Sequence, residues 1–106
     1  MIMLPKVMTM MNIDIHITNK VKKNLRKLGS NQDKNQVIKN LKQLQNEPYM
    51  GSSLSDDLHG YYSLHFSLSG GAARAIHTIL EEEKIVLIIL AGYRENVYKE
   101  AKRRIK

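Results

Sequence analysis

The sequence predicts a small single-domain α+β sandwich: a largely antiparallel four-stranded sheet with two N-terminal helices packed on one face, followed by a C-terminal helix. Three patterns predict this class. Residues 13–17 and 62–68 alternate between apolar and polar side chains, residues 19–45 hold two stretches with helical spacing, and residues 85–91 are continuously apolar. With 106 residues, the chain is long enough for one core and too short for two.

The N-terminal part is expected to be a strand followed by a first helix. Residues 13–17 carry isoleucine at every second position, which is typical of a strand. Thr18 or Asn19 can cap the helix that follows, and Gly29 can end it. Its apolar stripe consists of Val21, Leu25 and Leu28. The opposite side of this helix is basic.

A second helix is expected to run through Gln45. Ser30 and Asp33 resemble a capping box at its start, and Pro48 prevents its continuation. Its apolar stripe consists of Val37, Ile38, Leu41 and Leu44. Residues 49–60 then read as a linker that Leu54 and Leu58 fix to the core.

Residues 62–80 predict a hairpin with one polar side. The polar positions of its first strand are Ser63, His65 and Ser67. A four-residue loop over 69–72 would place Ser67 opposite Arg74, and His65, Ser67 and Arg74 would share the polar face. A three-residue loop would bury Arg74 among apolar side chains, which is costly for an unpaired guanidinium. We therefore expect the four-residue loop and an open polar face.

The C-terminal third predicts a central strand and a helix. Three glutamates at 81–83 mark a turn, residues 85–91 fit a strand covered on both faces, and Asn96 can cap the last helix. The inward residues of that helix are Val97, Ala101 and Ile105. His77 falls on the apolar side of its strand and is expected to be a core histidine.

Charge points to a polyanionic partner. The chain has 17 Lys and Arg against 10 Asp and Glu, a formal net charge of +7. The basic residues gather in the first helix and at the C-terminus, and we expect these to bind nucleic acid: Lys20, Lys22, Lys23, Arg26, Lys27, Lys102 and Arg103.

Composition excludes several classes of site. The chain has no cysteine, and its histidines show no metal-ligand spacing, so we expect no disulfide, no metal and no other cofactor. The absence of cysteine fits the reducing cytoplasm. No apolar run approaches the roughly 20 residues that cross a bilayer. Residues 1–10 are expected to be a disordered extension, with the domain spanning residues 11–106.

The remaining polar candidates suit RNA cleavage by attack of the 2′-hydroxyl. They are His65, Arg74, Tyr93, Arg94 and Tyr98. The reaction needs a proton acceptor, positive charge on the pentacovalent phosphate, and a proton or cation for the leaving oxygen. Histidine can transfer protons near neutrality, arginine binds phosphate bidentately, and tyrosine can stack on a base.

At these residues the sequence resembles the RelE/ParE superfamily of toxin-antitoxin toxins, on the RelE side. The motifs that carry the resemblance are Leu58-His59-Gly60-Tyr61, Arg74 in the second hairpin strand, Gly92-Tyr93-Arg94-Glu95 after the apolar strand, and Val97-Tyr98. The resemblance covers residues 12–105. It implies a RelE-like fold, an mRNA endonuclease that cuts in the ribosomal A site, and neutralisation by an acidic antitoxin.

The resemblance also implies roles for individual residues. Arg74 matches the arginine that stabilises the scissile phosphate, Arg94 the arginine after the apolar strand, and Tyr98 the tyrosine that stacks on the base. His65 falls where the family has a lysine or another proton-transfer residue. Tyr62, Ser63 and Ser67 stand where RelE-type members have basic residues.

Two other functions are open on the same fold. One is a non-enzymatic, ParE-like inhibitor of DNA gyrase. The other is a degenerate toxin that binds antitoxin or RNA without cutting. The pairing of Arg74 with Tyr98 favours the ribonuclease over the gyrase inhibitor.

Overall fold

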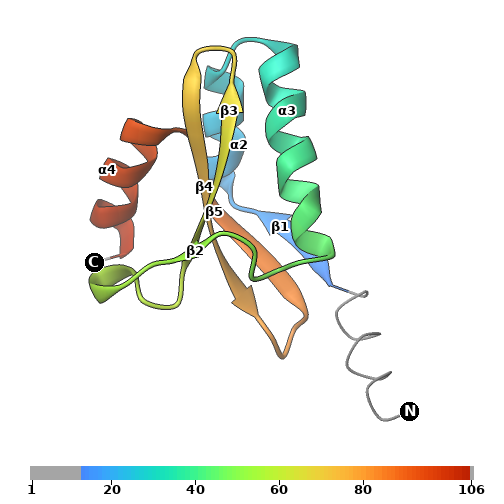
Figure 1. The fold of residues 1–106 in the computed structure, drawn as a ribbon, viewed down its shortest axis with the longest axis vertical. Helices are drawn as coiled ribbons and strands as arrows, with labels where there is room; N and C mark the ends of the chain where they lie inside the picture. Colours follow the sequence, from blue (N-terminus) through green and yellow to red (C-terminus); the bar gives the residue numbers. More distant parts are fainter. Residues whose placement is uncertain (1–12, 106) are drawn as a thin grey trace.

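The computed structural model describes residues 13–105, so the extension expected at residues 1–10 lies outside the described residues. The elements, in chain order, are β1 (Asp14–Ile17), α2 (Asn19–Lys27), α3 (Asn31–Lys42), the 3-10 turn η1 (Gln43–Gln45), β2 (Ser52–Ser53), the 3-10 turn η2 (Asp56–Leu58), β3 (Tyr62–Leu68), β4 (Gly71–Leu80), β5 (Ile85–Tyr93) and α4 (Arg94–Ile105). Figure 1 shows α2 and α3 on one side of the sheet and α4 on the other. The predicted α+β class is confirmed.

The sheet has five strands in the order β1-β5-β4-β3-β2. β1 runs parallel to β5, and every other neighbouring pair is antiparallel. The prediction of four strands was wrong by one, because β2 is formed by Ser52 and Ser53 alone. Two exposed serines show no hydrophobic alternation, so no pattern in the linker revealed this strand.

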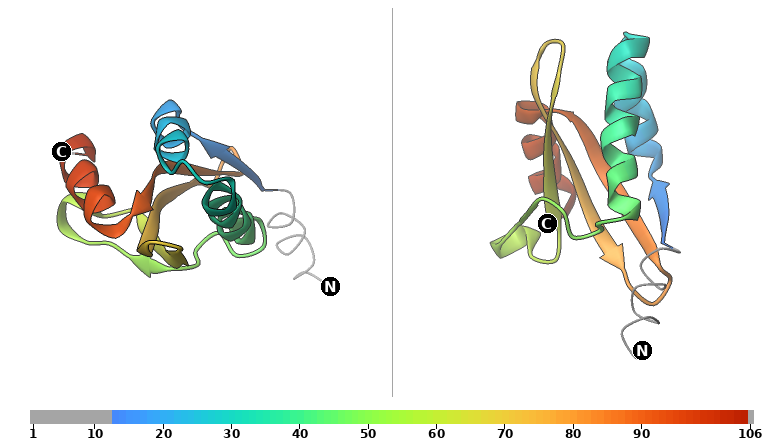
Figure 2. Two further views of the ribbon diagram at one scale, coloured as in Figure 1. Left: turned by 90° about the horizontal axis from the view of Figure 1, so that it is seen from above. Right: turned by 45° about the vertical axis from the view of Figure 1, so that its right-hand side comes forward.

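The helices α2 and α3 cover one face of the sheet, as predicted (Figure 2). The Thr18 hydroxyl accepts a hydrogen bond from the Val21 amide at 3.2 Å, and the Ser30 hydroxyl accepts one from the Asp33 amide at 3.3 Å. Val21 in α2 is fully buried. Ile38 was expected in the buried stripe of α3, but it is 41% exposed because the stripe turns away from the sheet at that position.

The other face of the sheet is only partly open. Leu58 from η2 and Val97 and Ala101 from α4 form a second cluster against the sheet residues Ile76 and Leu90. The expectation of a wholly open face was therefore wrong. Ser63, which pairs with Ile76, is consequently buried instead of facing solvent.

The last helix begins at Arg94, three residues earlier than a cap at Asn96 predicts. β5 continues through Tyr93 and α4 starts at Arg94, so Asn96 lies inside the helix and does not cap it. The inward placement of Val97 and Ala101 is confirmed. Arg94 thus stands at the junction of strand and helix.

The β3–β4 hairpin turns more tightly than predicted. Leu68 pairs with Gly71, so Ser69 and Gly70 alone form the turn, and His65, instead of Ser67, lies opposite Arg74. The observed register differs from the expected one by two residues. Because side chains alternate with a period of two, this shift keeps His65 and Arg74 on one face.

His77 is a core histidine, as predicted. Its side chain is fully buried, its Nε2 lies 3.0 Å from the Pro48 carbonyl oxygen, and its ring stacks on Tyr62. The carbonyl is an acceptor, so Nε2 carries the proton. Nδ1 is buried without a hydrogen-bond partner. Burial lowers the pKa of this imidazole.

Candidate active site

Three of the candidate catalytic residues meet at the hairpin end of the face that α4 partly covers. His65 on β3 is the direct cross-strand partner of Arg74 on β4, and Arg74 is in turn paired with Gly92 on β5. Cross-strand partners have Cβ atoms about 5 Å apart on the same face. Two residues beyond Gly92, α4 begins at Arg94.

The pKa of the His65 imidazole responds to both arginines. The pKa of His65 is lowered from its ordinary value first by partial desolvation, and then by the charges of Arg74 and Arg94. Two guanidiniums on different elements therefore both act on one imidazole. Positive neighbours disfavour the imidazolium, so His65 is held in the neutral form that can accept a proton.

The surroundings of these groups are accessible. His65 and Arg94 are exposed and Arg74 is half-buried. Gly92 on β5 is the cross-strand partner of Arg74 and lies two residues before the start of α4. It has no side chain to cover the surface there. Helix N-termini carry partial positive charge, so the start of α4 adds to the positive potential of the site. An anion such as a phosphodiester fits this arrangement.

Other predicted site residues are placed differently. Tyr98 lies on α4, one turn after Arg94, but its side chain and those of Lys102 and Arg103 fall outside the described part of the chain. Tyr93 packs instead against the main core on the α2–α3 side of the sheet. It therefore does not join the histidine and arginines.

Comparison with known proteins identifies the family. A family model described as the ParE-like toxin of the type II bacterial toxin-antitoxin system matches residues 15–102. The chain belongs to the ParE-like toxins. A search of curated proteins finds no match.

Solved structures share the fold of this toxin. A mutant of Escherichia coli toxin RelE in the free state has a TM-score of 0.68 and 24% sequence identity, covering 89% of this chain and 98% of that chain. The RelBE2 toxin-antitoxin complex from Mycobacterium tuberculosis gives 0.67 and 23%, covering 77% and 91%. The intact E. coli RelBE complex gives 0.62 and 18%, covering 77% and 96%. The predicted RelE-like fold is thereby confirmed.

The basic side of α2 does not face the candidate active site. Lys22, Lys23, Arg26 and Lys27 are exposed on the helix, and α2 and α4 cover opposite faces of the sheet (Figure 2). A groove of about 450 Å³ separates the two helices along β5. Three lysines, Lys20, Lys27 and Lys99, and one carboxylate, Glu100, line it.

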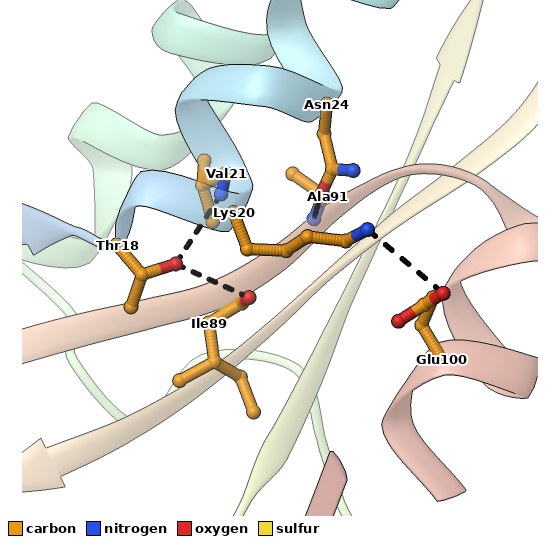
Figure 3. Close-up of polar contacts among 7 residues, drawn as sticks. All are labelled: Thr18, Lys20, Val21, Asn24, Ile89, Ala91 and Glu100. Atoms are coloured by element: carbon orange, nitrogen blue, oxygen red, sulfur yellow. Dashed lines mark hydrogen bonds and ion pairs between the residues drawn. The ribbon is translucent and has the colours of Figure 1, made fainter. Parts of the chain in front are cut away.

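Contacts across this edge hold α2 and α4 in place. Figure 3 shows Lys20 reaching from α2 toward Glu100 on α4, with 3.9 Å between the Lys20 Nζ and a Glu100 carboxylate oxygen. The Asn24 Oδ1 accepts a hydrogen bond from the Ala91 amide at 3.3 Å, and the Thr18 hydroxyl donates one to the Ile89 carbonyl at 3.4 Å. The side chains of Thr18 and Asn24 thus form hydrogen bonds with backbone groups of β5 beyond the end of β1.

The described residues contain no group of three or more His, Asp or Glu side chains that could hold a metal ion. None of the helices within residues 13–105 is long and apolar enough to cross a membrane. Sequence reasoning missed one polar contact near the site. Asp33 was assigned only to the helix cap, whereas its carboxylate also binds the hairpin turn at Ser69. No local pattern could reveal a contact between residues 36 positions apart.

Proposed function

We propose that this toxin is an endoribonuclease that cuts mRNA in the ribosomal A site and so inhibits translation in the cytoplasm. The observation that carries the proposal is the position of His65 directly opposite Arg74, within range of the Arg94 charge. One proton acceptor beside two phosphate-binding cations is the minimum that 2′-hydroxyl attack requires. No cofactor is needed for this step.

The proposed reaction proceeds in line at one phosphodiester. Neutral His65 takes the proton of the 2′-hydroxyl, and the 2′-oxygen attacks phosphorus. Arg74 and Arg94 bind the phosphate oxygens, on which negative charge rises in the transition state. The bond to the 5′-oxygen then breaks, and this oxygen takes a proton from solvent. The products are a 2′,3′-cyclic phosphate and a 5′-hydroxyl, and we propose that Tyr98 stacks on the neighbouring base.

Partners follow from the same proposal. The basic residues of α2, with Lys102 and Arg103, would bind ribosomal RNA through phosphate contacts. Similar structures include RelE bound to its antitoxin RelB, so we propose that an acidic antitoxin neutralises this toxin. The toxin's net charge of +7 suits such a partner.

The direct test is cleavage by the purified toxin. Programmed ribosomes with an mRNA codon in the A site are incubated with it, and the RNA ends are mapped by primer extension. Cleavage within the A-site codon supports the proposal. Inhibition of gyrase supercoiling without cleavage would support the alternative that the ParE-like family match allows, and neither effect would indicate a toxin without either activity.

Cleavage is expected to rise with pH through a midpoint below 6.5, because partial desolvation and the charges of Arg74 and Arg94 lower the pKa of His65 and extend its neutral form to lower pH. Single-turnover rates between pH 5 and 8 measure the midpoint. Arg94→Ala removes one of these charges and is expected to move the midpoint upward as well as to slow cleavage. Loss of the pH dependence in His65→Gln would identify His65 as the titrating group, whereas a midpoint that persists in that variant would exclude it.

Reversal of charge on α2 is expected to weaken ribosome binding without changing the chemical step. Lys22→Glu with Lys23→Glu should lower the affinity and reduce the slope of log K against log salt by about one for each phosphate that the variant no longer binds. Binding measured at several salt concentrations checks this. A weaker affinity with an unchanged salt slope would contradict a phosphate-binding role, and Asp14→Ala, far from both sites, is the surface control.

A further inference from the structure

The β3–β4 turn contacts two side chains that the proposed reaction does not use. Both carboxylate oxygens of Asp33 accept hydrogen bonds from Ser69. The Ser69 amide donates to Oδ1 at 3.1 Å and the Ser69 hydroxyl donates to Oδ2 at 2.8 Å. Asp33 is only 5% exposed although it lies in the first turn of α3. A buried carboxylate is costly unless its oxygens are satisfied, and here the hairpin satisfies them.

Tyr93, which lies on the same side of the sheet as α3, also packs against the turn. A Cβ atom built on Gly70 would lie 2.6 Å from the Tyr93 hydroxyl oxygen and 3.1 Å from the ring carbon that carries it. The backbone of Gly70 is not in the left-handed region, so glycine is needed here for this close approach and not for its φ angle. Tyr93 is the last residue of β5 and immediately precedes Arg94.

The Gly70–Tyr93 contact joins the two elements that carry the candidate catalytic groups, and the Asp33–Ser69 hydrogen bonds tie the hairpin to α3. His65 and Arg74 lie on the hairpin, whereas Arg94 lies at the start of α4. β3 and β4 extend beyond the part of the sheet that β1 and β2 flank, so the turn has no strand beside it there. In Figure 1 the hairpin tip rises past the sheet, at the level of the start of α3. Without these side-chain contacts, only the pairing of the strands would fix the position of the hairpin tip relative to α4.

We propose that Asp33 is a positioning residue: together with the Gly70–Tyr93 contact, it fixes the hairpin tip so that Arg74 and Arg94 bind the same phosphodiester. The inference rests on the proposed nuclease function, because it assigns Asp33 a role in that reaction without any contact to the substrate. Displacement of reacting groups by about 1 Å can lower a rate about a hundredfold. Asp33 therefore acts on catalysis through geometry.

The test combines kinetics with the titration of His65. Asp33→Ala is expected to lower kcat on programmed ribosomes by about a hundredfold with little change in KM, because the basic surface of α2 is untouched. NMR titration should show the pKa of His65 rising, since the hairpin moves away from Arg94. Loss of the Asp33 charge alone would lower that pKa, so the sign separates displacement from simple electrostatics. Asp14→Ala removes an exposed carboxylate elsewhere and is the control.

A second pair of variants tests the other contact. Gly70→Ala should lower kcat because the new methyl group collides with the Tyr93 hydroxyl, and Tyr93→Phe in the same chain should restore part of the loss by removing that oxygen. Urea unfolding of both chains separates this effect from a loss of stability: the positioning role predicts a lower kcat for Gly70→Ala at a concentration of toxin that is fully folded. If Asp33→Ala fails to fold, Ser69→Ala, which removes one of the two hydrogen bonds, carries the same expectations in milder form.

The outcomes are separable. Wild-type kcat and an unchanged His65 pKa in a folded Asp33→Ala or Ser69→Ala variant would overturn the positioning role. A Gly70→Ala, Tyr93→Phe chain no more active than Gly70→Ala alone would do the same. If the wild-type toxin does not cleave RNA at all, the nuclease proposal fails, and the His65 titration still shows whether Asp33 sets the distance from the hairpin to α4.

Discussion

Arg74→Ala is expected to lower kcat for mRNA cleavage by about 10² to 10³-fold, with the fold intact. Arg74 lies opposite His65 and in the same row as Gly92, so its guanidinium is the cation nearest to the proposed base across the sheet. Its interaction with phosphate strengthens as negative charge develops, so the loss should fall on kcat more than on KM. Single-turnover cleavage on programmed ribosomes measures both.

Two controls make this expectation specific. Lys39→Ala removes an exposed cation from α3 and should leave cleavage unchanged. Arg74→Lys keeps the charge but loses bidentate binding, so its activity should lie between those of wild type and Arg74→Ala. Cleavage by Arg74→Ala at the wild-type rate would remove this residue from the mechanism.

The second large effect concerns stability at acid pH. The free energy of unfolding is expected to fall as pH drops below 6.5, by at most about 1.4 kcal/mol per pH unit from His77. Burial holds the folded-state pKa of His77 below its unfolded value, so the unfolded chain binds more protons in this window. Stability is therefore present above pH 6.5 and lost as pH falls toward the folded-state pKa. Urea unfolding at pH 7 and pH 5 measures the difference.

His77→Gln is the matched variant. A glutamine amide can still donate to the Pro48 carbonyl, yet it does not titrate. The variant should be less stable than wild type at pH 7 and should show a weaker dependence on pH. His65 contributes with the same sign, because its pKa is also lowered. A pH dependence identical to that of wild type would exclude His77 as its source.

Much of the fold could be predicted because local patterns and tertiary burial agree. The alternation over residues 62–68, the stripe of Val21 and its helical neighbours, and the apolar run of β5 each give the correct element. Thr18 and Ser30 cap their helices as expected. The failures arise where distant contacts decide. Asp33 binds Ser69 in the hairpin turn across 36 positions of the chain, and Ser63 is buried on a face that alternation marks as polar.

The prediction that His65 and Arg74 share one face depended on the alternation of side chains along the strands and not on the exact strand register. Sequence reasoning placed Ser67 opposite Arg74, whereas the structure places His65 there. A shift of two residues preserves the face, so His65 and Arg74 were still assigned to the same side. Arg94 lies close to His65 and Arg74 because β5, which precedes it, is paired with β4. The sequences of the short strands β1 and β2 gave no indication of how much of the sheet face under α4 stays open.

The parallel pairing of β1 with β5 has a consequence for synthesis. Thr18, at the end of β1, bonds to Ile88 and Ile89, and the latter contact spans 71 positions of the chain. A nascent polypeptide emerges N-terminus first, so β1 cannot pair with its partner until residues 85–88 have been synthesised. Arg94, encoded later still, is added after that partner. The sheet that carries His65, Arg74 and the start of α4 is therefore completed only after residue 89 has been synthesised, so the proposed nuclease site cannot form earlier during translation.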